Sequence, residues 1–351
     1  VFLLALSVPA TADTTKVLLM PVQRFFGEYE IEPITIYDEK YGLYRVQDEI
    51  EVTERLLHLL NQADQLIEYV PYHILWDIQD PLVHAWIERF LKPNDRSGGG
   101  KVPSNMLPDR KTAAALLRDT GICFYLMPGY SSSVIGYDLI YLSVLDPGRG
   151  TAYPYDQYGV RAATYNDGYD RSVRPEETLT LDLKRGMVPD MIAVLRNASI
   201  QFLQVDRVDE AEAILELARS MLPRDRYGMI DLNRLRRPSL ESPAELATSV
   251  LWELIGIHRL RGSYAKASEY ALDLIGMQPA VDRENWRSPA SDYWRTSYSE
   301  MPAKAIIADT LIKAGQWTAA ESLVEESALQ HPMAGLMDTY NLWLKLVYID
   351  A

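Results

Sequence analysis

The chain has 351 residues, of which 48% are apolar and 24% charged, as in folded globular proteins and unlike disordered ones. With 49 acidic against 35 basic side chains, its net charge of -14 repels phosphate backbones and argues against nucleic acid as a partner. The length is about twice that of a typical domain, so two units with separate cores are expected.

The opening segment, residues 1–12, is uncharged and apolar and ends in small residues. It resembles the end of a secretory signal peptide, with Ala10-Thr11-Ala12 as a small-x-small cleavage pattern before Asp13. No later run reaches the roughly 20 apolar residues that a membrane span requires. The sequence therefore predicts an exported, periplasmic protein without a membrane span.

Residues 13–186 alternate candidate strands with candidate helices, which predicts a small α/β domain. Strands are expected at 16–22, 65–76, 122–129 and 137–146, with a hairpin partner at 151–160. Helices are expected at 51–63, 82–91 and 108–120. Cys123, the only cysteine, lies in the third strand, so no internal disulfide can form and the thiol is expected to be inert.

The order of helix, strand and hairpin in this domain resembles the amino-terminal domain of the periplasmic translocation protein TolB and its CsgG-like relatives. The matching features are the alanine-rich stretch from Ala113, the step Thr120-Gly121-Ile122, and the turn from Asp146 to Gly150. The chain departs from that family at Ile122-Cys123, where Ala-Asp is common. The resemblance covers about residues 16–160 and implies an exported assembly or sensing module without catalysis.

A tyrosine-rich tract lies at the junction between the two predicted domains, where Arg161 accompanies Tyr153, Tyr155 and Tyr158. Tyrosine and arginine favour contact sites, because both combine a large surface with a polar tip. A domain interface is the preferred interpretation, and a sugar platform or a peptide groove is an alternative.

Residues 187–351 repeat one pattern three times, in which an alanine is followed twelve residues later by a proline that ends the segment. The pairs are Ala211 and Pro223, Ala267 and Pro279, and Ala320 and Pro332. Each pair lies in an amphipathic stretch that follows another helical stretch, with Gly262 and Gly315 at the last two corners. Stacked helical hairpins are predicted.

These hairpins resemble tetratricopeptide repeats, which have a small residue in the second helix, an aromatic near its start and a terminating proline. Tyr264 and Trp317 match the aromatic, whereas the first hairpin has Asp206 in place of the corner glycine and Val208 in place of the aromatic. The alanines lie 56 and 53 residues apart. Since the family repeat is about 34 residues, each interval carries an insertion, at 224–243 and 280–300.

The tetratricopeptide resemblance implies a concave groove lined by the first helix of each hairpin. The family's groove positions fall on Arg196, Trp252, Arg259 and Lys313. Basic groups in an otherwise acidic protein suit an acidic or carboxylate-ended peptide. The second insertion, with Trp286 and Trp294, is either a cap folded back on the repeats or a further partner-binding surface.

Motifs for catalysis, metal binding and cofactor binding are missing from the sequence. The five histidines are dispersed without H-x-x-x-H spacing, and neither a nucleophile elbow nor a phosphate-binding glycine loop occurs. No catalytic residue, metal site or cofactor is therefore predicted. The predicted fold class is α+β and multidomain, a small TolB-like α/β domain followed by a helical array resembling tetratricopeptide repeats.

The predicted function is a non-enzymatic periplasmic scaffold or assembly factor that binds other proteins of the cell envelope. The alternative is a small-ligand or glycan-binding protein, or a hydrolase, that uses the tyrosine-rich tract and its acids. The acids in that tract are Asp156, Asp167 and Asp170.

Overall fold

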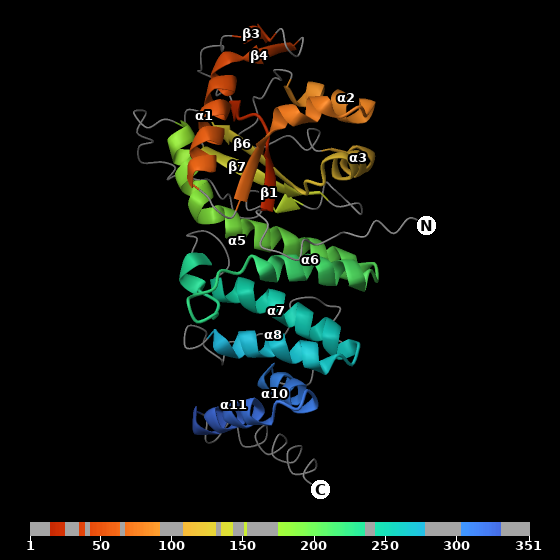
Figure 1. Cartoon of the computed structure of the whole chain (residues 1–351), viewed down its shortest axis with the longest axis vertical. Helices are drawn as coiled ribbons and strands as arrows, with labels where there is room; N and C mark the ends of the chain where they lie inside the picture. Colours follow the sequence, from red (N-terminus) through yellow and green to blue (C-terminus); the bar gives the residue numbers. More distant parts are fainter. Residues whose placement is uncertain are drawn as a thin grey trace. The chain divides into compact units, whose positions relative to one another are not determined.

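Figure 1 shows the computed structural model of the chain, which divides into two compact units. The first unit comprises residues 1–198 with 237–240, and the second comprises 199–236 with 241–351. The structure describes residues 15–24, 35–38, 43–63, 67–91, 108–130, 135–142, 151–152, 175–235, 243–277 and 303–330.

The first unit contains a six-stranded mixed sheet. Its strands are β1 (Thr15–Leu19), β2 (Gln23–Arg24), β5 (Ile67–Pro71), β6 (Phe124–Tyr130), β7 (Ile135–Tyr141) and β8 (Thr151–Ala152). Strands β5, β1 and β6 are parallel neighbours, and β7 and β8 continue the sheet antiparallel. Strand β2 pairs with β6 past the end of β1, while β3 (Thr35–Asp38) and β4 (Leu43–Val46) form a separate ribbon.

Helices cover both faces of this sheet, as Figure 1 shows: α2 (Pro81–Leu91) and α3 (Arg110–Thr120) on one side, and α1 (Gln47–Ala63) on the other. Alternate strand residues face opposite sides. Leu18 and Tyr125 therefore join the core formed by α2, α3 and the short helix η1 (Tyr72–Asp77), whereas their fully buried neighbours Val17 and Phe124 face the other side. Because helices cover both faces of the sheet, these strands are apolar at consecutive residues rather than at every second residue.

The predicted helix at 108–120 is confirmed, and its ends follow from local chemistry. The carboxylate of Asp109 accepts the N–H of Thr112 at 2.8 Å, which caps the first turn. Gly121 ends the helix with a φ of 67°, a left-handed conformation that glycine adopts without a Cβ clash. Strand β6 can then begin three residues later.

In the described part of the second unit, each helix packs on the next. The helices are α6 (Val208–Ser220), α7 (Pro243–Leu260), α8 (Tyr264–Gly276), α10 (Ala303–Lys313) and α11 (Trp317–Gln330), with the short helix η3 (Leu232–Leu235) between α6 and α7. Contacts join α6 to α7, α7 to α8, α8 to α10 and α10 to α11. Such nearest-neighbour packing is typical of helical repeats, and we call these five helices the helical array.

Three corners in the second unit share one backbone conformation. The corner residues are Asp206, Gly262 and Gly315, with φ values of 58°, 70° and 76°. After each, the next residue donates its N–H to the carbonyl five positions earlier, at 2.8 to 2.9 Å. This is the Schellman pattern of helix ends. The first corner adopts it without glycine, since aspartate tolerates the left-handed region better than most residues.

The three repeated alanines occupy equivalent places after these corners. Ala211, Ala267 and Ala320 each follow the corner residue by five positions and are 0% exposed. Each donates its N–H at 3.1 Å to the carbonyl of the residue directly after the corner. Their burial within helices agrees with the prediction that small side chains at these positions face a neighbouring helix.

Helix α5 (Pro175–Gln204) differs from its prediction, which began a helix at Pro189 and a domain at residue 187. The helix starts 14 residues earlier and includes Pro189, and the two units divide after Ala198, within α5. Proline lacks only one N–H, so a helix can continue through it when packing compensates for the lost bond. Among the described helices, α5 included, none combines the length and apolar character needed to cross a bilayer.

Candidate functional site

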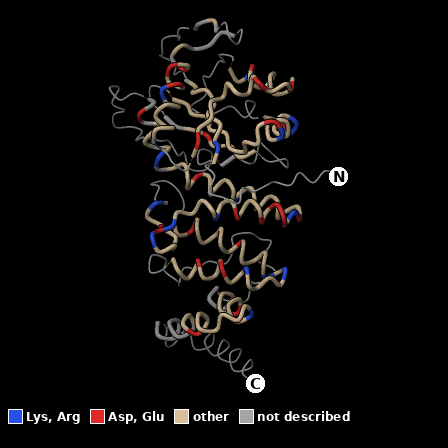
Figure 2. The backbone as a smooth tube through the Cα atoms, viewed as in Figure 1, with Lys and Arg blue, Asp and Glu red and all other residues tan. Residues whose placement is uncertain are grey.

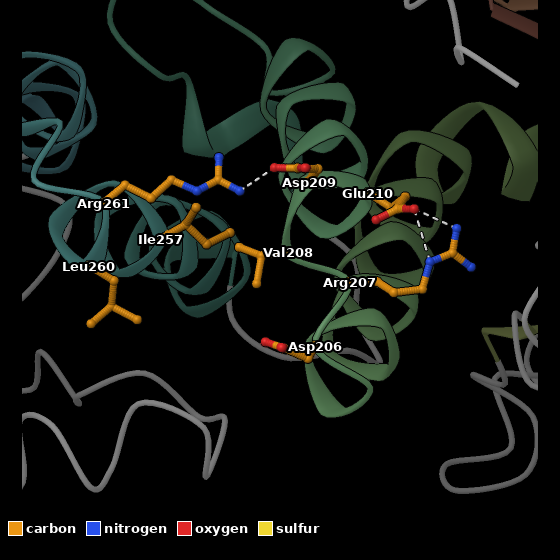
Figure 3. A pocket seen from close by; sticks show the side chains of 8 residues that line it. All are labelled: Asp206, Arg207, Val208, Asp209, Glu210, Ile257, Leu260 and Arg261. Carbon is orange, nitrogen blue, oxygen red and sulfur yellow. Dashed lines mark hydrogen bonds and ion pairs between the residues drawn. The ribbon is translucent and has the colours of Figure 1, made fainter. Parts of the chain in front are cut away.

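The corner between α5 and α6 borders a hollow of about 490 Å³ (Figure 3). The first turn of α6 and the last turn of α7 form its walls. Leu260 is 53% exposed and lies with Val208 around the opening, which makes this part of the wall apolar. The lining residues are Asp206, Arg207, Val208, Asp209, Glu210, Ile257, Leu260 and Arg261.

Ion pairs surround the hollow. Arg261, directly after α7, bonds both Asp209 and Glu212 of α6, and Arg207, directly before α6, bonds Glu210 of its first turn. The hydrogen bond from Arg207 lowers the pKa of Glu210 despite partial burial. The lining therefore carries Arg207 and Arg261 against Asp206, Asp209 and Glu210, so most of its charges are paired and a small acidic excess remains.

Helices α6, α7 and α8 bring together a second group of polar side chains, which we call the interhelix cluster: Glu212, Glu216, His258, Lys266 and Tyr270. The Nε2 atom of His258 lies 3.1 Å from Glu212 Oε1. The Nζ atom of Lys266 lies 3.1 Å from Glu212 Oε1 and 3.0 Å from Glu216 Oε1. The Tyr270 hydroxyl donates to Glu216. Three helices are thus joined through two carboxylates.

Burial and charge set the protonation states in the interhelix cluster. Burial lowers the pKa of His258 more than the Glu212 carboxylate raises it, so the imidazole is neutral at pH 7. Burial alone would raise the pKa of Glu212, but Lys266 and the other cations outweigh it and the pKa is lowered. Burial and the bond to Glu216 raise the pKa of Tyr270. Lys266, whose pKa is raised by its carboxylate partners despite partial burial, and Glu212 therefore stay charged near neutrality.

The interhelix cluster has the donor atoms of a cation site, since oxygen or nitrogen atoms of Glu212, Glu216 and His258 lie within 4.8 Å of one another. The Lys266 ammonium, however, hydrogen-bonds both carboxylates from the position that a metal cation would need. Arg261 adds a second positive charge on Glu212. The residues do not fit a metal, and we interpret the cluster as a polar contact between neighbouring hairpins.

Two residues predicted to line a partner groove come together on one carboxylate. Arg259 donates to Asp309 at 2.8 Å, to the Thr310 hydroxyl at 2.6 Å and to the carbonyl of Ile306 at 3.0 Å. Lys313 lies 3.1 Å from the same Asp309 carboxylate. Burial would raise the pKa of Asp309, but these two cations lower it. Arg259, only 9% exposed, joins α7 to α10 and does not present its charge to a partner.

Trp252 and Arg196 also differ from the predicted groove. Trp252 is 2% exposed in α7, where its ring is part of the core of the second unit. Arg196 is half-buried in α5 and belongs to the first unit, so it is not grouped with the other three. Of the four predicted groove residues, Lys313 is the one whose side chain is exposed. A concave groove built from all four residues is therefore not what these helices form.

Several predicted site residues lie outside the described residues. They are Trp286 and Trp294 of the second insertion, Tyr153, Tyr155, Tyr158 and Arg161 of the tyrosine-rich tract, and the acids Asp156, Asp167 and Asp170. The prolines Pro279 and Pro332 lie outside them as well. Cys123 is described, and burial raises the pKa of its thiol to about 11, so it is protonated at neutral pH.

Sequence reasoning missed the interhelix cluster. Its hydrogen-bonded pairs lie up to 54 residues apart in the chain, and the spacing between histidines gives no signal for His258. One local signal existed: Glu212 and Glu216 are four residues apart and therefore share one face of α6. The partners of these two glutamates on α8 could be found only by aligning the hairpins on the three repeated alanines. That alignment makes α6 and α8 equivalent helices of successive hairpins.

Comparison with protein-family models, with curated proteins and with solved structures found no match to this chain.

Proposed function

We propose that this chain is a non-enzymatic scaffold or assembly factor of the cell envelope that binds other proteins through its helical array. The repeated corner is the observation that carries the proposal: three left-handed residues, three identical backbone bonds and three buried alanines in register. Repeats stacked in this way expose a continuous surface whose size grows with each hairpin, which suits recognition of extended partners.

The resemblance to tetratricopeptide repeats and to the TolB amino-terminal domain belongs to this proposal. Exported location rests on the signal-like residues 1–12. The proposal differs from the sequence-based one in the surface used. Exposed apolar side chains at the hairpin corners, such as Leu260 and Trp317, replace the buried Trp252 and Arg259 as candidate contacts.

The state of the clustered ionisable groups supports a non-enzymatic role. Around the hollow and in the interhelix cluster, Asp209, Glu210, Glu212 and Glu216 each have a cation partner. A general base or nucleophile needs an accessible face and a pKa near the working pH. The hydrolase alternative would use residues 153–170, and the described residues offer no observation in its favour.

The test is capture of partners by the full chain in the cells that make it, with in-cell crosslinking and mass spectrometry. We expect a recurrent protein partner that binds the purified chain saturably in calorimetry. Leu260→Asp should weaken that binding, whereas Leu82→Asp, at a similarly exposed leucine of the first unit, should not. Absence of any saturable protein partner, together with turnover of a glycan substrate, would overturn the proposal.

A further inference from the structure

The segment between α6 and η3 forms a folded tip that exposes large side chains. Tyr227 is 73% exposed and Met229 is 41% exposed. Arg226 stacks on the Tyr227 ring, with its guanidinium carbon 4.7 Å from the ring centroid. Tyrosine, arginine and methionine are enriched in protein interfaces because each offers a large contact area. We call residues 224–234 the basic tip.

The backbone of the basic tip is held in one conformation. Arg224 and Ile230 form an antiparallel bridge, and the Asp225 carboxylate accepts the N–H groups of Tyr227 at 2.8 Å and Met229 at 3.0 Å. Ile230 is buried below the turn. A surface ordered before binding loses less entropy when a partner arrives, so these bonds favour recognition.

The basic tip is also fastened to α8. Arg224 and Arg219 both donate to the Asp273 carboxylate, at 2.7 and 2.8 Å. Burial would raise the pKa of Asp273, but the two arginines outweigh it and lower the pKa. Met229 lies so close to Gly276 that a Cβ there would come within 2.7 Å of its terminal methyl group. The tip therefore moves with the helical array.

Charge distinguishes the basic tip from the rest of the protein. The tip, residues 224–234, has three arginines and two aspartates, and Arg236 and Arg237 follow it closely in a chain of net charge -14. Arg219 and Arg224 share Asp273, whereas no ion pair of Arg226 or Arg234 occurs among the described residues. Figure 2 shows basic positions gathered where the chain turns between α6 and α7. The exposed arginines attract negative charge.

We propose that the basic tip is a docking surface for an acidic segment of a protein partner, in which carboxylates meet Arg226 and Arg234 and an apolar side chain packs on Tyr227 and Met229. This inference rests on the proposed scaffold function and names the surface and the partner chemistry. An acidic peptide is favoured over a lipid surface because the tip offers an aromatic and a thioether for side-chain contact, while the remaining chain repels anionic membranes.

The test uses a display library of random linear peptides selected on the immobilised full chain. We expect enrichment of acidic peptides that contain an aromatic or aliphatic residue. An enriched peptide measured by fluorescence polarisation should lose about tenfold or more in affinity with Tyr227→Ala or Arg226→Glu, and its binding should weaken with added salt. Tyr37→Ala and Arg110→Glu, at exposed positions of the first unit, are matched controls that should change little.

Other results would overturn the inference. These are enrichment of basic or purely apolar peptides, no enrichment at all, or equal binding of the acidic peptides by both tip variants. Tyr227-dependent binding to phosphatidylglycerol vesicles without peptide binding would assign the tip to membranes instead. A crosslinked protein partner that binds wild type and Tyr227→Ala equally would agree with the scaffold function and would contradict only the docking role of the basic tip. Circular dichroism of each variant checks folding.

Discussion

Arg259 and Lys313 show at the residue scale how burial decides the role of a basic side chain. Both reach the Asp309 carboxylate, yet Arg259 has a side chain that is 7% exposed and Lys313 one that is 45% exposed. Removing a buried donor leaves several desolvated acceptors without their hydrogen bonds, whereas an exposed cation is replaced by water. The two residues that sequence reasoning grouped as one binding surface therefore have different roles.

We expect Arg259→Ala to lower the free energy of unfolding by about 3 kcal/mol, because Asp309, Thr310 and the Ile306 carbonyl lose their shared donor. Lys313→Ala should cost less than about 1 kcal/mol, since that ion pair is exposed. Urea unfolding of both variants measures the difference. Equal losses would contradict the assigned burial.

His258 predicts a pH dependence of stability. Its pKa in the folded protein lies below the unfolded value of 6.5, so stability from the neutral imidazole is present above pH 6.5 and is lost as the pH falls below it. The lowered carboxylate pKa values act in the same direction but below pH 4.5, outside this window. The groups that face His258 are Glu212 and Glu216 of α6, Arg261 directly after α7, and Lys266 and Tyr270 of α8.

Between about pH 7.5 and pH 5.5, we expect the melting temperature of the wild type to fall more than that of His258→Gln, which cannot take up the proton. Glutamine keeps a donor for Glu212, so the variant should fold. Thermal circular dichroism at both pH values gives the two shifts. A fall that is the same in the variant would mean that another group is responsible.

At the scale of the element, the hairpin corner is the repeating structure of the second unit. The left-handed residue ends one helix, the next helix begins two residues later, and the alanine five positions after the corner is buried. The three alanines are 0% exposed, and because protein interiors are close-packed, we expect a larger side chain there to push the helices apart.

Ala267→Met should therefore lower the stability of the protein by about 1–3 kcal/mol through overpacking. Ala265 is exposed on the same helix, α8, so Ala265→Met adds the same side chain without entering the contact and should change stability by less than about 0.5 kcal/mol. Chemical denaturation of the pair makes the comparison. If the two variants are equally stable, the alanines do not face neighbouring helices as tightly as the structure indicates.

At the scale of the whole molecule, two compact units imply two cores. Leu18 is fully buried in the sheet of the first unit, and Leu254 is fully buried in α7 of the second. Truncating either to alanine should cost about 2–5 kcal/mol. Calorimetry should resolve two unfolding transitions. Leu18→Ala should lower the temperature of one transition, and Leu254→Ala should lower the temperature of the other. A single transition that both variants lower would show that the units unfold together.

The sequence by itself determined the elements whose signal is local. Apolar strands bounded by turn residues predicted the sheet of the first unit, and Asp109 and Gly121 marked the ends of α3. The alanines and corner residues predicted where the hairpins of the second unit turn. Capping, backbone conformation and side-chain periodicity depend on a few neighbouring residues, so one sequence contains enough information to predict them.

Only the tertiary structure decided which polar residues meet and which are exposed. Arg259 is buried because α10 supplies Asp309 fifty residues later, and Lys266 reaches Glu212 across 54 residues. Arg226 and Tyr227 are exposed because the turn that contains them is fastened to α8 through Asp273 and stands away from the core. Burial and charge pairing depend on the neighbouring element rather than on the local pattern. For this reason the repeat positions did not predict that the groove residue Arg259 is buried, nor that exposed arginines lie in the insertion after α6.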